Sequence, residues 1–311
     1  MHKPKGILVT GTHRSGTTWV GRIISLSPGI VYIHEPFNAQ CSAAAISYQF
    51  KHWFSYVEDL EDKEDFLKAF EATLDFRHVP SLPLSKISDF HALKRYMRNY
   101  IDNLSHRIRK RVPLIKDPIA LLSAEFLASN FDLSVICMIR HPLAFCGSLK
   151  KWNWSFAFSN LLNQGCAIEK YFPDEQEEIE RFSEEEQDIV SQAILLWSLL
   201  HKVIKMYQET HPDWMFVRHE DLVADPIGGF KRIYEKMGLA FRNNIKEGIL
   251  NLTNSTEEES DVPSFMARNL SSVTETWKKR LDADEVERII RKTTFLRNHF
   301  YPERDGKLIN F

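Results

Sequence analysis

The fold is decided near the start of the chain by the stretch Gly6-Ile7-Leu8-Val9-Thr10-Gly11-Thr12-His13-Arg14-Ser15-Gly16-Thr17-Thr18. Residues 6–11 form a short apolar run that ends at a glycine, which indicates a buried parallel strand. Residues 17–26 have the pattern of a helix. The two glycines let the intervening backbone turn its N–H groups toward an anion, and the helix N-terminus adds partial positive charge. The stretch therefore predicts a phosphate-binding loop between a strand and a helix.

This loop differs from the loop of nucleoside triphosphatases. The lysine that would follow the second glycine is replaced by Thr17, and a cation, Arg14, comes two residues before Gly16. A lysine in that place bridges the phosphates of a magnesium-bound triphosphate, whereas Arg14 suits a different anion held without a metal. A P-loop kinase or NTPase stays open as an alternative, although no clear magnesium-binding acid follows a strand.

Strand and helix patterns alternate along the rest of the chain. Strands are expected at residues 30–33, 112–116, 133–139 and 214–218. Helices are expected at residues 91–110, 120–129, 184–208, 227–237 and 284–297, and from residue 142 onward. The alternation predicts an α/β fold of the P-loop nucleotide-binding type, with a central parallel sheet flanked by helices. A single domain over residues 1–311 is expected.

Composition narrows the class of protein. The 311 residues carry a formal net charge of −2, so no nucleic-acid partner is expected. The four cysteines form no CxxC pair and no zinc-type cluster, which predicts no metal site and a reducing compartment. The strongest apolar stretch, residues 193–200, is too short to span a bilayer, and the start of the chain lacks a signal-peptide core. We therefore expect a cytoplasmic protein without a transmembrane segment.

A second anion-binding motif follows the strand at residues 133–139. Arg140 ends this strand, and Ser148 follows in the next helix. Ligands of open α/β sheets bind outside the carboxyl ends of the strands, so Arg140 can reach a phosphate and Ser148 can donate a hydroxyl. The alternative is an arginine that pairs with a carboxylate at the strand end. After the strand at 214–218, Glu220 and Asp221 are expected to cap a helix.

These two motifs resemble those of sulfotransferases that use 3′-phosphoadenosine 5′-phosphosulfate (PAPS). The resemblance is closer to the bacterial and carbohydrate branches of this superfamily than to the cytosolic branch. It implies that the 5′-phosphosulfate is held by Arg14, Ser15, Gly16, Thr17 and Thr18. It also implies that Arg140 and Ser148 hold the 3′-phosphate.

Two weaker resemblances extend toward the C-terminus. Residues 217–222 resemble a Tyr-Glu-Asp-Leu element of the family, with His219 in place of the tyrosine that lies near the adenine. Residues 265–281 resemble the family's closing segment, in which basic residues contact the 3′-phosphate, and Arg268 is the residue carried over. His219 and Arg268 are therefore further candidates for nucleotide binding.

Sulfuryl transfer needs a base, cations that stabilise the transferring group, and in-line alignment of donor and acceptor. The sequence Lys116-Asp117-Pro118 resembles a Lys-Thr-His element of the cytosolic branch, in which the lysine contacts the sulfuryl group and the histidine is the base. The lysine matches, but Pro118 stands at the histidine position. Glu35, after the second strand, becomes the candidate base, with Asp117 as the second choice. The alternative for Glu35 is a structural ion pair.

The sequence thus predicts an enzyme that moves a sulfuryl group from PAPS to an acceptor hydroxyl or amine and releases adenosine 3′,5′-bisphosphate without a metal. Glu35, Lys116 and Arg14 are the predicted catalytic residues. The acceptor is a small molecule or a glycan, and a carbohydrate is favoured because Glu35-Pro36 resembles the carbohydrate branch. Residues 37–110 and 153–185 are expected as insertions on the acceptor side. The missing histidine also leaves open a non-catalytic nucleotide-binding protein, and the oligomeric state is not predicted.

Overall fold

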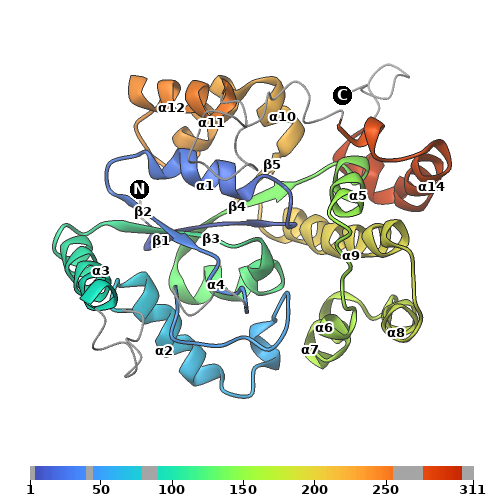
Figure 1. Cartoon of the computed structure of the whole chain (residues 1–311), viewed down its shortest axis with the longest axis horizontal. Coiled ribbons are helices and arrows are strands. Elements are labelled where there is room, and N and C mark those ends of the chain that lie inside the picture. Colours follow the sequence, from blue (N-terminus) through green and yellow to red (C-terminus); the bar gives the residue numbers. More distant parts are fainter. Residues whose placement is uncertain (1–3, 40–44, 79–89, 255–275, 303–311) are drawn as a thin grey trace.

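The computed structural model describes residues 4–39, 45–78, 90–254 and 276–302. Within these ranges, parallel strands form one five-stranded sheet in the order β2-β3-β1-β4-β5 (Figure 1). The strands are β1 (Gly6–Gly11), β2 (Ile30–His34), β3 (Val112–Lys116), β4 (Leu133–Ile139) and β5 (Met215–Arg218). Since all five run the same way, the segments that follow β1, β2, β3 and β4 meet at one edge of the sheet.

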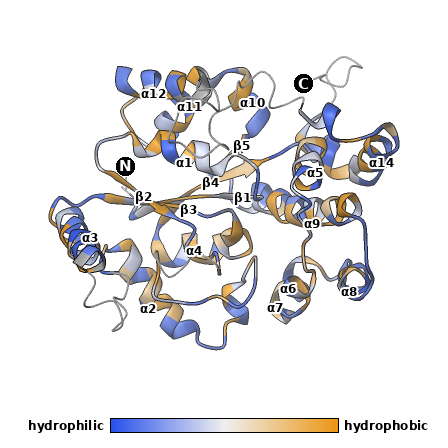
Figure 2. Cartoon of the chain, in the orientation of Figure 1, coloured by the Kyte–Doolittle hydropathy of each residue, from blue (hydrophilic) through white to orange (hydrophobic). Residues whose placement is uncertain are grey.

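Both faces of the central strands β1, β3 and β4 are buried. Along β1, Ile7 and Val9 pack in one apolar cluster, whereas Leu8 packs in the other. The first face is covered by α1 (Thr17–Ser25), α11 (Pro226–Lys236) and α12 (Asn243–Asn254), and the second by α4 (Ala124–Phe131) and α9 (Ile189–Thr210). Burial on both sides explains why the strands are continuous apolar runs (Figure 2).

Further helices complete the architecture. They are η2 (Val57–Asp59), α2 (Lys63–Leu74), α3 (Phe90–Ile108), η4 (Pro118–Ser123), α5 (Pro142–Lys151), α6 (Ser159–Leu162), α7 (Gly165–Tyr171), α8 (Gln176–Glu184), α10 (His219–Ala224), η5 (Thr276–Lys279) and α14 (Ala283–Phe300). α5 begins at Pro142 as predicted, because proline suits the first helical position and His141 Nδ1 accepts the N–H of Leu143 at 3.3 Å.

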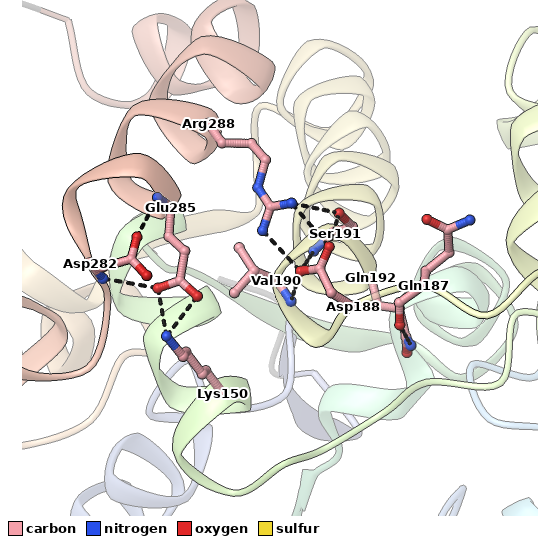
Figure 3. Close-up of polar contacts among 9 residues, drawn as sticks. All are labelled: Lys150, Gln187, Asp188, Val190, Ser191, Gln192, Asp282, Glu285 and Arg288. Carbon is pink, nitrogen blue, oxygen red and sulfur yellow. Dashed lines mark hydrogen bonds and ion pairs between the residues drawn. The ribbon is translucent and has the colours of Figure 1, made fainter.

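The C-terminal helix α14 is fixed to α5 and α9 by polar contacts (Figure 3). Lys150 Nζ donates to both carboxylate oxygens of Glu285 at 2.6 Å. Arg288 forms a two-pronged ion pair with Asp188, at 2.9 and 3.0 Å, and also contacts Ser191 Oγ at 3.2 Å. Asp188 in turn caps α9 by accepting the N–H of Ser191 at 3.0 Å. The Asp188 carboxylate therefore caps α9 and also forms the ion pair that fixes α14 against it.

The helix predicted at residues 184–208 is wrong at its start. Glu184 ends α8, and α9 begins only after its cap, Asp188. The expectation that no apolar stretch reaches the length of a bilayer span is also corrected. In the part of the chain that the structure describes, α9 alone, with 22 residues, is long and apolar enough, and 61% of its most apolar window is buried inside the protein. Burial of this kind is usual for a core helix.

Candidate active site

The phosphate loop joins β1 to α1 and depends on two glycines. Gly11 has a φ of 134°, and a Cβ there would lie 2.3 Å from the carbonyl oxygen of Met138. Gly16 is the N-cap of α1 with a φ of 88°, and a Cβ there would lie 2.6 Å from Nδ1 of His219. Glycine is therefore required at both ends of the loop, because these backbone angles and these close contacts exclude a larger residue.

The hydroxyls of the loop have different surroundings. The side chain and the N–H of Ser15 both donate to the carbonyl oxygen of Thr12, so in this structure Ser15 shapes the loop from within. Thr17 is the first residue of α1 and is buried. The Thr18 side chain lies beside the Tyr32 side chain, where α1 contacts β2. The N-terminus of α1 thus presents its N–H groups from a fixed position.

Arg14 joins the loop to the second predicted motif. Its Nε donates to Ser148 Oγ at 3.1 Å, although the two residues are 134 positions apart in the chain. Arg14 has a φ of 63°, in the left-handed region, and its guanidinium lies 6.0 Å from the centroid of the Trp152 ring. Such a conformation in a non-glycine residue is often found at functional sites. The structure therefore brings together the two motifs that the sequence suggested for phosphate binding.

Arg140 stands at the end of β4 against a buried carboxylate. Its Nε lies 3.4 Å from Glu220 Oε1, and both side chains are almost fully buried. Glu220 also accepts the N–H of His141 at 3.1 Å and the hydroxyl of Tyr301 at 2.7 Å. The alternative pairing of Arg140 with a carboxylate is thus present, and this pairing fixes the guanidinium at the edge of the sheet.

The capping roles expected for Glu220 and Asp221 are wrong. The N-cap of α10 is Arg218, and no side chain caps it. Asp221 instead accepts a hydrogen bond from Arg218 Nε at 2.7 Å, while Glu220 is used by Arg140. Sequence reasoning missed Glu220 as a site residue because its partner comes from a distant strand end.

His219 packs directly against the phosphate loop. It begins α10, it is buried, and its ring meets Trp19 edge-on with centroids 6.0 Å apart. Within the described ranges, both ring nitrogens of His219 and the indole Nε1 of Trp19 are buried without a hydrogen-bond partner. Burial and the charge of Arg140 lower the pKa of His219 well below its ordinary value, so the ring is neutral. Buried polar atoms normally have partners, and these atoms are therefore candidate contacts for a polar ligand.

Lys116 and Glu35 form an ion pair at the ends of β3 and β2. Lys116 Nζ contacts Glu35 Oε1, and Asn38 Nδ2 donates to Glu35 Oε2 at 2.7 Å. The N–H of Glu35 donates to the carbonyl oxygen of Lys116 at 2.9 Å, and the φ of Glu35 is 44°. The ion pair that was the alternative for Glu35 is therefore present, beside the phosphate loop.

This ion pair sets the protonation of both groups. Burial alone would raise the pKa of Glu35, but Lys116 and Asn38 outweigh it and lower the pKa below its ordinary value. Burial lowers the pKa of Lys116, and Glu35 opposes that effect. Glu35 is thus an ionised carboxylate at neutral pH, as a base must be, and it has a cation in contact.

Asp117 is a structural residue in this arrangement. Its Oδ2 accepts the N–H of Phe37 at 2.6 Å, and its Oδ1 accepts the N–H of Ile119 at 3.0 Å. Burial raises the pKa of Asp117 to about 7 despite these bonds. Because both oxygens hold backbone groups, Asp117 is less suited than Glu35 to take a proton from an acceptor. Pro118 follows as the first residue of η4.

Aromatic rings from two distant segments surround His13 of the phosphate loop. The ring centroids of Trp53 and Trp154 lie 6.2 and 5.0 Å from that of His13, and 5.6 Å from each other. The N–H of Trp53 also donates to Asn160 Oδ1 at 2.9 Å. Burial lowers the pKa of His13 to about 3, so this ring is neutral as well. Parts of both predicted acceptor-side insertions therefore meet beside the loop.

The structure does not describe every predicted site residue. Arg268 lies outside the described residues. In the ranges that the structure describes, no group of three or more His, Cys, Asp or Glu residues has the arrangement of a metal site. The predicted site residues that the structure does describe lie at the carboxyl edge of the sheet or on the loops and helices that follow it.

Comparison with known proteins identifies the family. The model of the sulfotransferase family matches residues 4–243. Carbohydrate sulfotransferase 4 of Mus musculus is 21% identical over 319 aligned residues, which cover 92% of this chain and 79% of that protein. Carbohydrate sulfotransferase 2 of Homo sapiens is 29% identical over 83 residues. This second match covers 25% of this chain and only 16% of the relative's own length.

Solved structures were compared as well. The sulfotransferase domain of the Synechococcus PCC 7002 olefin synthase has a TM-score of 0.48 and 14% identity, with 95% of this chain and 96% of that chain covered. Mouse sulfotransferase SULT7A1 complexed with PAP has a TM-score of 0.47 and 12% identity, with 94% and 85% covered. Since the family model covers well over half of the 311 residues, the chain belongs to the sulfotransferase family.

Proposed function

We propose that the protein transfers the sulfuryl group of PAPS to a hydroxyl or amine of a glycan or small-molecule acceptor. The observation that supports this proposal is the hydrogen bond from Arg14 to Ser148, which joins the two motifs that the sequence predicts for anion binding. A donor with phosphate groups at both its 5′ and 3′ positions needs two such motifs. The carbohydrate sulfotransferases among the relatives favour a carbohydrate acceptor.

The residues present fit this donor, which when bound supplies an already activated sulfuryl group. Arg14 and the N–H groups at the start of α1 would hold the 5′-phosphosulfate. Arg140 and Ser148 would hold the 3′-phosphate by charge-assisted and hydroxyl hydrogen bonds. The unpartnered nitrogens of His219 and Trp19 suit the polar edge of a nucleobase. These atoms are the observation on which the fit rests.

Glu35 and Lys116 have complementary roles in the proposal. Glu35 accepts the proton of the acceptor group, since its lowered pKa keeps it ionised. Lys116 orients Glu35 and brings positive charge to the place where negative charge develops during transfer. Adenosine 3′,5′-bisphosphate is the expected product.

Calorimetry with adenosine 3′,5′-bisphosphate and adenosine 5′-phosphate tests the donor. We expect the bisphosphate to bind in the presence of EDTA and to bind more tightly than the monophosphate. Arg140→Ala should weaken binding of the bisphosphate at least about tenfold and that of the monophosphate little, since a hydrogen bond to a charged group contributes about 1.5–3 kcal/mol. The double variant Arg140→Ala, Glu220→Gln avoids leaving Glu220 as an unpaired buried charge.

Two outcomes would overturn the proposal. A strict requirement for magnesium with a preference for ATP would favour the P-loop kinase or NTPase. Tight binding of the bisphosphate without turnover of PAPS, over a panel of sugars, phenols and amines, would favour the non-catalytic nucleotide-binding protein. Equal losses of both nucleotides in the Arg140 variants would show that Arg140 does not read the 3′-phosphate.

A further inference from the structure

Helix α3 exposes its apolar side chains and turns polar ones toward the body of the protein. Six large apolar residues, spaced along one stripe, have between 41% and 73% of their surface exposed: Leu93, Met97, Tyr100, Ile101, Leu104 and Ile108. At 3.6 residues per turn this stripe covers about 100° of the helix. Half-buried Asn99 and Asn103 face inward, and Asn103 Nδ2 donates to the carbonyl oxygen of His78 at 2.5 Å. A surface helix normally has the opposite arrangement.

The position of α3 leaves this apolar stripe accessible. Figure 1 shows α3 at the outer end of the molecule, on the β2 side of the sheet and opposite α14. Among the described elements, no helix or strand packs closely along α3. Hydrophilic and hydrophobic residues are both visible on it in Figure 2. An exposed row of large apolar residues is typical of a surface that binds a protein, a ligand or a membrane.

Basic residues accompany the stripe. Residues 91–111 contain seven Lys or Arg residues and one acid, Asp102, in a chain whose formal net charge is −2. Lys94 and Arg98 lie next to the stripe on one side and Arg107 on the other, at helical spacing. Within the described ranges, none of the ion pairs involves these three residues. The positive charge of these three side chains is therefore not neutralised by an acid in the described ranges.

A hollow of about 560 Å³ opens at the C-terminal end of α3. Arg107, Lys110 and Arg111 line it together with Lys5 and Arg77. Lys5 and Arg77 are already paired with acids on α2 or just after it. In the part of the chain that the structure describes, no ion pair to Arg107, Lys110 or Arg111 is seen. Asp75 also lines the hollow, paired with Lys5 and Arg77, so five basic residues face one acid there. The hollow is thus a basic recess at the end of the helix that carries the stripe, and it suits phosphate groups.

We propose that α3 docks the protein on the surface of a bilayer that contains anionic phospholipids. The apolar stripe would enter the region below the headgroups, while the flanking Lys and Arg residues and the basic recess contact lipid phosphates. A nucleic acid would leave the apolar stripe unused. A second copy of the chain would bring two strongly basic helices together, which like-charge repulsion opposes. The proposal is independent of the reaction that the site performs.

Vesicle co-sedimentation with the full chain tests this docking surface. We expect binding to phosphatidylcholine vesicles that contain phosphatidylserine, much weaker binding to pure phosphatidylcholine, and weakening by salt. The double variant Arg98→Glu, Arg107→Glu should lose at least about tenfold in vesicle affinity, since each basic residue near an anionic surface contributes roughly fivefold. Met97→Glu with Ile101→Glu should abolish binding.

Matched variants separate the helix from general charge and hydrophobicity. Lys231→Glu with Lys236→Glu, on exposed positions of α11, makes the same change in net charge and should leave vesicle binding intact. Phe295→Glu removes a side chain of α14 that is 77% exposed and should also have no effect. Circular dichroism melting and nucleotide affinity check that each variant folds.

Three results would overturn the proposal. The first is wild-type protein that ignores the anionic vesicles, and the second is equal loss of vesicle binding in the α11 and α3 charge variants. The third is a wild-type dimer in sedimentation velocity that Ile101→Glu converts to a monomer, without vesicle binding by either. That result would assign the stripe to a contact between copies of the chain.

Discussion

Gly16 and the imidazole of His219 are in contact at the phosphate loop, with no room for a methyl group between them. We predict that Gly16→Ala lowers the free energy of unfolding by about 1–3 kcal/mol, because the residue must keep a φ of 88° and displace His219. Nucleotide affinity should fall at the same time. Urea denaturation and calorimetry measure the two effects.

The matched control for this prediction is Gly165→Ala. Gly165 begins α7, and a Cβ there meets no atom within 4 Å. This variant should keep both stability and nucleotide affinity. If the Gly16 and Gly165 variants behave alike, the contact with His219 does not constrain the loop.

Glu35 is predicted to set the acid limb of the rate profile. Its pKa is lowered from 4.5, chiefly by Lys116 against the opposing effect of burial, so the carboxylate is ionised at and above that pH. Activity should therefore persist down to about pH 4.5 and fall only as pH drops through the lowered pKa. Glu35→Gln should reduce turnover by about 10²–10⁴-fold, keep nucleotide affinity and lose the acid limb.

Asn38→Ala is the control, since it removes one hydrogen bond to Glu35 and keeps the base. This variant should retain most of its turnover but show the acid limb at a higher pH. If Glu35→Gln turns over within about threefold of wild type, the base is another residue, because general-base catalysis contributes far more. If Glu35→Gln loses nucleotide or unfolds, the ion pair with Lys116 is structural only.

Candidate site residues that lie in local sequence motifs can be predicted from the sequence. Contacts between residues far apart in the sequence cannot. Arg14, Arg140 and Ser148 could be proposed because they lie in local motifs at predicted strand ends, and the structure places Arg14 in contact with Ser148. The carboxylate that fixes Arg140 comes from α10, and no local pattern indicates that pairing. Trp19 and its unpartnered nitrogen were missed, since only packing against α10 shows that its Nε1 is buried.

At the scale of elements, strand bounds were predicted more accurately than helix bounds. β1, β3 and β4 have the predicted limits, because each is an apolar run ended by a glycine or a charged residue. The helix before β5 was started too early, at Glu184, since the glutamates there favour helix by propensity. The residues after Glu184 instead lead to the cap Asp188, whose hydrogen bonds define the true start.

Asp188 gives a prediction at this scale. Asp188→Ala should lower the free energy of unfolding by about 1–2 kcal/mol through loss of the cap, and it also removes the partner of Arg288 on α14. The pKa of Asp188 is lowered, by Ser191 and Arg288 against burial, so the difference from wild type should shrink as pH falls below about 3.8. Glu186→Ala, at an exposed position nearby, should be neutral in the same urea titrations.

At the scale of the whole molecule, two segments far apart in sequence pack together beside the phosphate loop. The buried side chain of Gln164 joins them: its Oε1 accepts the N–H of Tyr56 at 2.7 Å, and its Nε2 donates to the carbonyl oxygen of Phe54 at 3.3 Å. That both segments build the acceptor side stays a prediction. The cytoplasmic location stays a prediction.

Gln164→Ala tests whether these joined segments form the acceptor side. The substitution leaves the N–H of Tyr56 buried without a partner, which should cost about 1–3 kcal/mol in the free energy of unfolding. If the segments bind the acceptor, the KM for the acceptor should rise while the affinity for adenosine 3′,5′-bisphosphate stays unchanged, because the nucleotide motifs lie on other elements. Asn163→Ala, at the exposed neighbouring position, should change neither quantity. A loss of nucleotide affinity equal to the rise in KM would contradict this division, because it would mean that the two segments support the donor site as a whole.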